Sequence, residues 1–143
     1  MNTSPSSPAL STLVLVDPTF PDGSSSLSLI DDDEDLVLIV VLISGRCSHA
    51  LHDRARRTGR GVMTAAWSHL ESLALRVSRP GRVVGTIVAG GPDPAVELSA
   101  IAAEHPARRV IVPSSSVEFD PGLVRRISRQ TRLTVVYPEP APV

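Results

Sequence analysis

The densest group of chemically versatile side chains lies between residues 47 and 53, where Cys47, His49, His52 and Asp53 occur together. His49 stands three residues before His52 and four before Asp53, so a helix would place all three on one face. Zinc accepts such ligands. The sequence has no second ligand cluster of the kind that completes a zinc signature. We therefore predict a polar helix start with a free thiol and no metal site.

A second group of candidates lies where predicted strands end. Asp17 follows the first apolar run, and ligands in open α/β sheets bind outside the carboxyl ends of the strands. Ser114, Ser115 and Ser116 follow the fourth run and precede a helix, whose N-terminus could hold a phosphate or another anion. The alternatives are a turn aspartate and a polar loop whose serines bond locally, with Glu118 repelling an anion.

Bond-making chemistry finds no support in the sequence. There is no G-x-S-x-G nucleophile elbow, and no histidine and aspartate stand at a recognisable catalytic spacing. All 14 basic residues are arginine, which excludes the Walker A lysine and Schiff-base catalysis. The single cysteine excludes an internal disulfide. We expect a protein that is not an enzyme.

Composition and apolar run length argue against nucleic acid and membranes as partners, and against secretion. The formal net charge is −1 and aromatic residues make up 3%, which argues against nucleic-acid binding. Residues 1–11 are not a secretory signal, and the longest apolar run, 36–43, is far shorter than the roughly 20 residues of a membrane-spanning helix. We expect a cytoplasmic protein without membrane insertion. The acidic run 31–35 reads as a solvated loop or as a contact for the arginines of 54–60.

Apolar runs alternate with helical patterns along the chain, which predicts an α/β fold. Right-handed crossovers would give a three-layer Rossmann-like sandwich around a five-stranded parallel sheet. The predicted domain spans 12–138, with a flexible tail at 1–11 and a proline-rich tail at 139–143. The predicted strands cover 12–16, 36–43, 83–89, 109–112 and 133–137. Helices are predicted within 48–77, from Pro94 to Pro106 and from Pro121, with one helical turn at 27–30.

Within the first long helix, apolar residues recur at spacings of three and four. This pattern predicts one buried face. The face consists of Met63, Ala66, Trp67, Leu70, Leu73, Ala74 and Val77. The next helix begins with Asp93 as N-cap and Pro94 at the first helical position.

The element order and three local features resemble the universal stress protein family over roughly 12–138. The first strand ends in Val16-Asp17, where the family has an aspartate. A glycine-containing link, 90–95, leads into a helix with the segment "IAAE", and the last strand, "TVV", ends near a proline. The resemblance implies that Asp17 contacts adenosine, and it implies a homodimer through the last strand.

Two departures separate the chain from the ATP-binding members. Those members carry G-x-x-G, about nine residues, and then G-S/T after the fourth strand, because glycines let backbone N–H groups approach phosphate. Here the stretch 112–122 has a single glycine, Gly122. Proline, glycine and acidic residues also take the place of the family's first helix.

We therefore expect a stress-related regulatory or interaction module that binds no cofactor and acts as a homodimer or on a protein partner. The predicted dimer interface is the last strand, with Leu133, Thr134, Val135, Val136 and Tyr137. One alternative is a member that binds ATP or AMP through Asp17 and the serines 114–116. Another is an accessory subunit that docks through the acidic run or the arginine-rich face.

Overall fold

The apolar runs of the sequence form one parallel sheet with the strand order β3-β2-β1-β4-β5 in the computed structural model. The structure describes residues 10–16, 25–42, 53, 55–57, 59, 61–90, 93–112 and 121–136. The elements are β1 Ser11–Leu15, η1 Ser25–Leu29 (a 3₁₀ helix), β2 Leu36–Leu42, α2 Val62–Val77, β3 Val83–Ala89, α3 Pro94–Glu104, β4 Ala107–Ile111, α4 Pro121–Thr131 and β5 Thr134–Val136.

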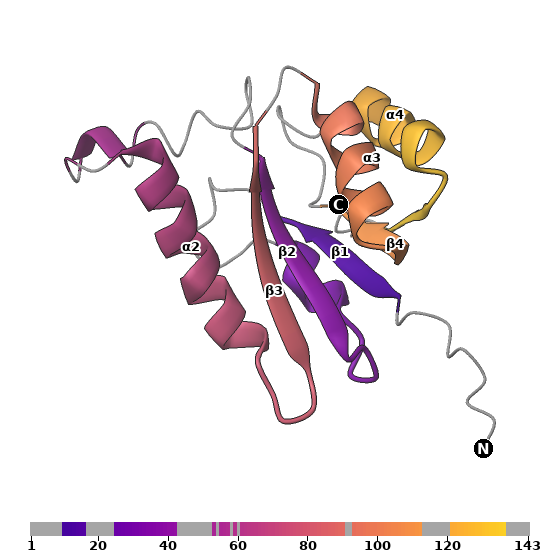
Figure 1. The fold of residues 1–143 in the computed structure, drawn as a ribbon, viewed down its shortest axis with the longest axis horizontal. Helices are drawn as coiled ribbons and strands as arrows, with labels where there is room; N and C mark the ends of the chain where they lie inside the picture. The colour runs from indigo at the N-terminus through magenta and orange to yellow at the C-terminus, as the bar shows by residue number, and fades with distance from the viewer. Residues whose placement is uncertain are drawn as a thin grey trace, which may run out of the picture.

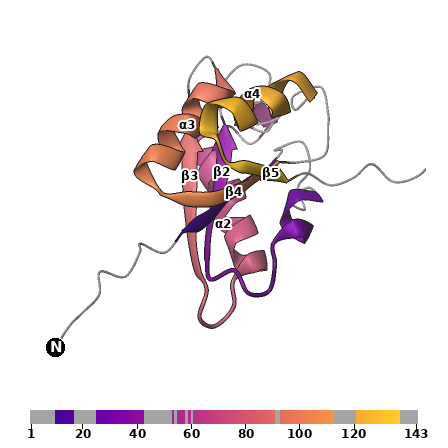
Figure 2. The ribbon, with the colours of Figure 1, turned by 90° about the vertical axis from the view of Figure 1, so that its right-hand side faces the viewer.

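Helices cover both faces of the sheet, so the predicted three-layer α/β sandwich is confirmed. Figure 1 shows α2 on one side of the strands and α3 with α4 on the other. Figure 2 shows α3 and α4 side by side, with α2 and η1 across the sheet from them. All pairings between the strands are parallel.

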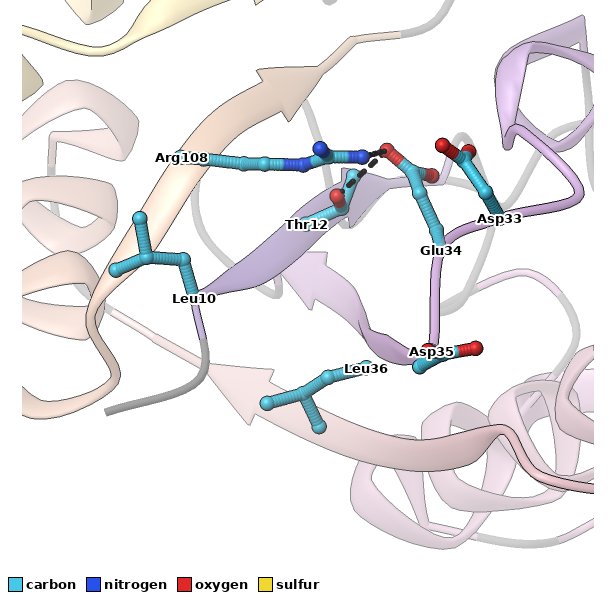
Figure 3. A pocket seen from close by; sticks show the side chains of 7 residues that line it. All are labelled: Leu10, Thr12, Asp33, Glu34, Asp35, Leu36 and Arg108. Atoms are coloured by element: carbon cyan, nitrogen blue, oxygen red, sulfur yellow. Dashed lines mark hydrogen bonds and ion pairs between the residues drawn. The ribbon is translucent and has the colours of Figure 1, made fainter. Parts of the chain in front are cut away.

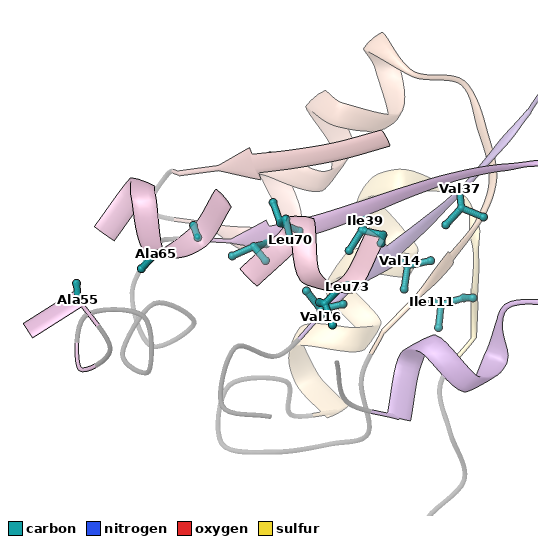
Figure 4. Packing of buried hydrophobic residues seen from close by; sticks show 11 residues of the cluster. Val14, Val16, Val37, Ile39, Ala55, Ala65, Leu70, Leu73 and Ile111 are labelled. Atoms are coloured by element: carbon teal, nitrogen blue, oxygen red, sulfur yellow. The ribbon is translucent and has the colours of Figure 1, made fainter. Parts of the chain in front are cut away.

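Alternation along the strands divides the core into two layers. In β1, Leu13 and Leu15 pack with α3 and α4, whereas Val14 packs toward α2. The layer under α2 joins residues of β1, β2 and β4 to the helix residues Leu70 and Leu73, as Figure 4 shows. Both faces of the central strands β1 and β2 are therefore buried, as their continuous Val, Ile and Leu runs predict.

Two strand starts differ from the prediction. β1 begins at Ser11, which was assigned to the flexible tail, and β4 begins at Ala107 instead of Arg109. The reason is local pairing: Ser11 lies opposite Ala107, and the N–H of Ser11 donates to the carbonyl of Pro106 at 3.0 Å. Pairing between the two strands therefore extends both of them at their amino ends, beyond the apolar runs.

The link between β1 and β2 contains a single helical turn in its described part. η1 spans Ser25–Leu29, close to the predicted turn at 27–30. Leu27, Leu29 and Ile30 are partly buried against the layer under α2. In the described part of this link, the helical segment is therefore a five-residue 3₁₀ helix.

The buried face of α2 is displaced from the predicted one. Ala66, Leu70 and Leu73 are fully buried as predicted, but Met63 is 48% exposed and Trp67 is 40% exposed. Their prediction as core residues is wrong. α2 lies over β3, the outermost strand, and β2, so its outer flank has no neighbour in the described part of the chain. Ala65 and His69, on the inner flank, are buried instead.

Asp93 joins the predicted helix start to the neighbouring helix. Its side chain accepts a hydrogen bond from the N–H of Ala95 at 3.0 Å, and it forms an ion pair with Arg126 on α4. Asp93→Ala should lower the free energy of unfolding by about 1 kcal/mol, because an N-cap is lost. Arg126→Ala removes only the ion pair and should cost less. Urea denaturation of both variants measures the difference, and equal losses would contradict the capping role.

Candidate functional site: a buried carboxylate at the amino ends of the strands

Most of the residues considered above as candidates for chemistry, including the group predicted not to bind a metal, lie outside the described residues. These are Asp17, the serines 114–116, Cys47, His49 and His52. Asp53 is described and forms an ion pair with Arg56 on the same short helical stretch. The carboxyl ends of the strands therefore provide no described polar cluster, and the clearest one lies at the amino ends.

Glu34 is the centre of this cluster. It lies two residues before β2, and its side chain is 1% exposed. One carboxylate oxygen, Oε1, accepts a hydrogen bond from the Thr12 hydroxyl at 2.8 Å, from Arg108 Nη2 at 2.7 Å and from Arg109 Nε at 2.8 Å. The other oxygen, Oε2, accepts from the backbone N–H of Asp31 at 3.2 Å. A buried charge needs such partners, and Glu34 has them.

Arginines also hold the backbone of the acidic segment. Arg82 Nε donates to the carbonyl of Glu34 at 2.8 Å, and its Nη2 donates to the carbonyl of Asp31 at 3.0 Å. Arg109 Nη2 donates to the carbonyl of Leu29 at 3.1 Å. These bonds tie η1, the acidic segment and the start of β3 to β4. The expectation of a solvated acidic run is therefore wrong for Glu34, which forms ion pairs with Arg108 and Arg109 of β4.

Two opposing effects determine the ionisation of Glu34. Burial alone would raise its pKa, but the hydrogen bonds from Arg108, Thr12 and Arg109 outweigh burial and lower the pKa below the ordinary value of 4.5. Glu34 is therefore a carboxylate at neutral pH. A general acid or base needs a pKa near the working pH, so this environment suits an ion pair and not proton transfer.

A shallow pocket adjoins Glu34. It has a volume of about 390 Å³ and is lined by Leu10, Thr12, Asp33, Glu34, Asp35, Leu36 and Arg108 (Figure 3). Figure 3 shows Arg108 reaching across Thr12 to Glu34, so the guanidinium closes one wall of the pocket by an internal contact. Three acidic side chains line the pocket, and its one arginine already forms an ion pair with Glu34, so the lining does not suit an anion. We interpret the cluster as a structural clamp between β1, β2 and β4.

Among the described residues, no three histidine, cysteine or acidic side chains are placed to hold a metal ion. His69 is buried in α2, and His105 is exposed at the C-cap of α3.

The predicted interface strand lies at the edge of the sheet, next to β4 alone. The structure forms it from three residues, Thr134–Val136, so Leu133 precedes the strand, and Tyr137 lies outside the described residues. The edge position is as predicted, whereas pairing with a second copy stays a prediction.

Sequence reasoning missed Glu34, Arg108 and Arg109. Their separation of 74 and 75 residues hides the contact from any local pattern. One signal was present. A glutamate two residues before one buried strand and two arginines at the start of another come together if both strands run parallel near the middle of one sheet. The alternation of strands and helices already predicted that arrangement.

Comparison with known structures defines the fold as universal-stress-protein-like. A scan against models of protein families and a search of curated proteins give no match. Among solved structures, the chain is similar to the hypothetical protein PH0823, with 22% identity, a TM-score of 0.65, and coverage of 93% of this chain and 98% of that one. It is also similar to the hypothetical protein MJ0577, with 12% identity, a TM-score of 0.66, and coverage of 94% and 98%. In the described ranges, every helix is too short or too polar to cross a bilayer.

Proposed function

We propose that the chain is a regulatory interaction domain of the universal-stress-protein type, cytoplasmic, without catalytic activity and without tight ATP binding. The position of Gly122 carries this proposal. In the ATP-binding members of the resembled family, glycines form a phosphate loop after the fourth strand. Gly122 is the sole glycine of 112–122, and it is the second residue of α4. The stretch 112–121 before the helix therefore contains no glycine, and it lacks the residues that let the loop backbone of those members approach a phosphate closely.

The described part of the link between β1 and β2 supports the same proposal. The family's first helix covers one edge of the nucleotide cleft, and η1 in its place has five residues. The residues of η1 belong to the clamp around Glu34, because Arg109 donates to the carbonyl of Leu29. This segment therefore helps to hold the amino ends of the strands together, away from the end where ligands bind in such sheets.

Protein contacts are the mode of action in this proposal. The sequence predicts that the last strand, Leu133–Tyr137, pairs with a second copy, but the described part of that strand has three residues, whereas β3 at the opposite edge has seven. The N–H of Val112 donates to the carbonyl of Val136, so the backbone groups of Val136 and Thr134 face β4. Within Thr134–Val136, only the backbone groups of Val135 face away from β4, and the described edge is therefore short.

Thermal unfolding with and without adenine nucleotides tests the proposal. We expect ATP, ADP and AMP, with or without magnesium, to leave the unfolding temperature unchanged. A ligand at roughly 1 mM with a Kd of roughly 0.1 mM would stabilise the protein by about 1.4 kcal/mol and raise the unfolding temperature by several degrees. A rise that disappears in Asp17→Ala would instead favour a nucleotide-binding protein that uses Asp17 and the serines 114–116.

A further inference from the structure

In the described part of the chain, the outer edge of β3 is the longer of the two sheet edges. There β3 pairs with β2 and with no other described strand, and its sequence VVGTIVA contains no charged residue and no proline. Val83 is 63% exposed, and the six following residues are partly exposed. Edge strands usually carry charges, prolines or bulges that block pairing with another chain. The described part of β5, by contrast, has three residues.

The hydrogen bonds of β3 show which of its backbone groups face outward. The N–H of Val83 donates to the carbonyl of Asp35 beside β2 at 2.7 Å. Because the backbone groups of successive strand residues point to alternate sides, Val84, Thr86 and Val88 direct their N–H and C=O groups away from β2. No hydrogen bond from elsewhere in the described chain reaches these groups. The outward-facing residues Val84 and Val88 lie at equal distances along the strand on either side of Thr86.

An apolar flank of α2 accompanies this edge. Met63 and Trp67 are one turn apart and half-exposed, and Ala74, seven residues after Trp67, is partly buried on the same flank. α2 lies in the crossover from β2 to β3. In a right-handed crossover, the right-handed turn of the helix directs Met63, Trp67 and Ala74 away from β2, beyond the edge. This spacing is typical of the seam between two packed helices.

We infer that the β3 edge pairs with the β3 edge of a second copy of this chain, antiparallel, about a two-fold axis through Thr86. Val84 then lies opposite Val88 of the partner subunit, and each such pair exchanges two backbone hydrogen bonds. The inference rests on the proposed interaction function and assigns its partner. It requires no nucleotide, so the nucleotide experiments test the proposed function separately.

The position of α2 favours a second copy over an added peptide strand. Paired strands lie about 4.8 Å apart, and α2 packs against both β3 and β2, so its axis lies slightly inside β3. The two-fold axis therefore brings the two α2 helices to a separation on the order of 8–10 Å, the distance at which helices pack. Met63 and Trp67 of both copies become covered. A lone peptide strand would leave them exposed.

Sedimentation equilibrium with paired variants tests the dimer. Met63→Glu changes an exposed residue, so it should fold normally, but it places two carboxylates in the helix seam and should raise the dimer Kd by roughly tenfold or more. Thr86→Pro removes an outward-facing N–H, which an edge strand tolerates, and should give a monomer. Leu75→Glu, on the same helix but outside the seam, is the control and should remain a dimer. Trp67 is the sole tryptophan, so its emission should shift to the blue as the wild type dimerises.

Cross-linking identifies the edge that pairs. In a Cys47→Ser background, Thr86→Cys should form a disulfide between two copies under mild oxidation, because the two Thr86 residues lie opposite each other, whereas Val135→Cys, at the centre of β5, should not. The inference would be overturned by a wild-type protein that stays monomeric at micromolar concentration. It would also be overturned by cross-linking through Val135→Cys alone, which would assign the dimer to β5.

Discussion

Replacing Glu34 with glutamine should lower the free energy of unfolding by about 3 kcal/mol, because the change removes the charge that two arginines share in a buried site. Arg108 and Arg109 both donate to Oε1 of Glu34, and the side chain of Arg109 is itself mostly buried. Urea denaturation at neutral pH measures the loss. Asp32→Asn is the matched control in the same acidic segment, since Asp32 is exposed, and it should change stability by less than about 0.5 kcal/mol.

Acid should remove the same contribution from the wild type. The pKa of Glu34 is lower in the folded protein than its ordinary value of 4.5, so folding favours the carboxylate. The stabilisation is complete above pH 4.5 and is lost as the pH falls through the lowered pKa. The stability difference between wild type and Glu34→Gln should therefore shrink from neutral pH to about pH 3. A difference that stays constant over this range would contradict the ion-pair interpretation.

Leu73→Ala should cost about 3 kcal/mol, because it empties space in the layer between α2 and the sheet. Leu73 is fully buried and packs in the same cluster as Val14 and Ile39 (Figure 4). Leu75 stands two residues further along the same helix and is 79% exposed, so Leu75→Ala should have almost no effect. Equal losses in the two variants would mean that α2 is rotated from the described orientation, which would also displace Met63 and Trp67.

The sheet could be predicted from the sequence because its strands are continuous apolar runs. The prediction of 83–89 matches β3 residue for residue, and the predicted order of elements is the observed one. The first residues of β4, Ala107 and Arg108, could not be predicted, because their place in the strand depends on pairing with Ser11 nearly 100 residues earlier. Strand starts of this kind depend on the neighbouring strand and not on local composition.

The orientation of α2 was predictable only in part. Helical spacing identifies an apolar stripe, but a stripe is wider than the surface that an edge helix can bury. Met63 and Trp67 share the spacing of Leu70 and Leu73, and only the position of β3 at the end of the sheet leaves them exposed. The burial of Glu34 was hidden for the related reason that its arginine partners are distant in sequence.

The central claim is that this fold serves protein contacts and not nucleotide binding, and isothermal titration calorimetry with ATP and magnesium tests it most directly. The protein used should first show a cooperative unfolding transition, so that an absent signal reflects the folded state. We predict no saturable heat. Binding tighter than about 100 μM, equivalent to about −5.5 kcal/mol, would contradict the account and would make Asp17 and the serines 114–116 the first positions to mutate.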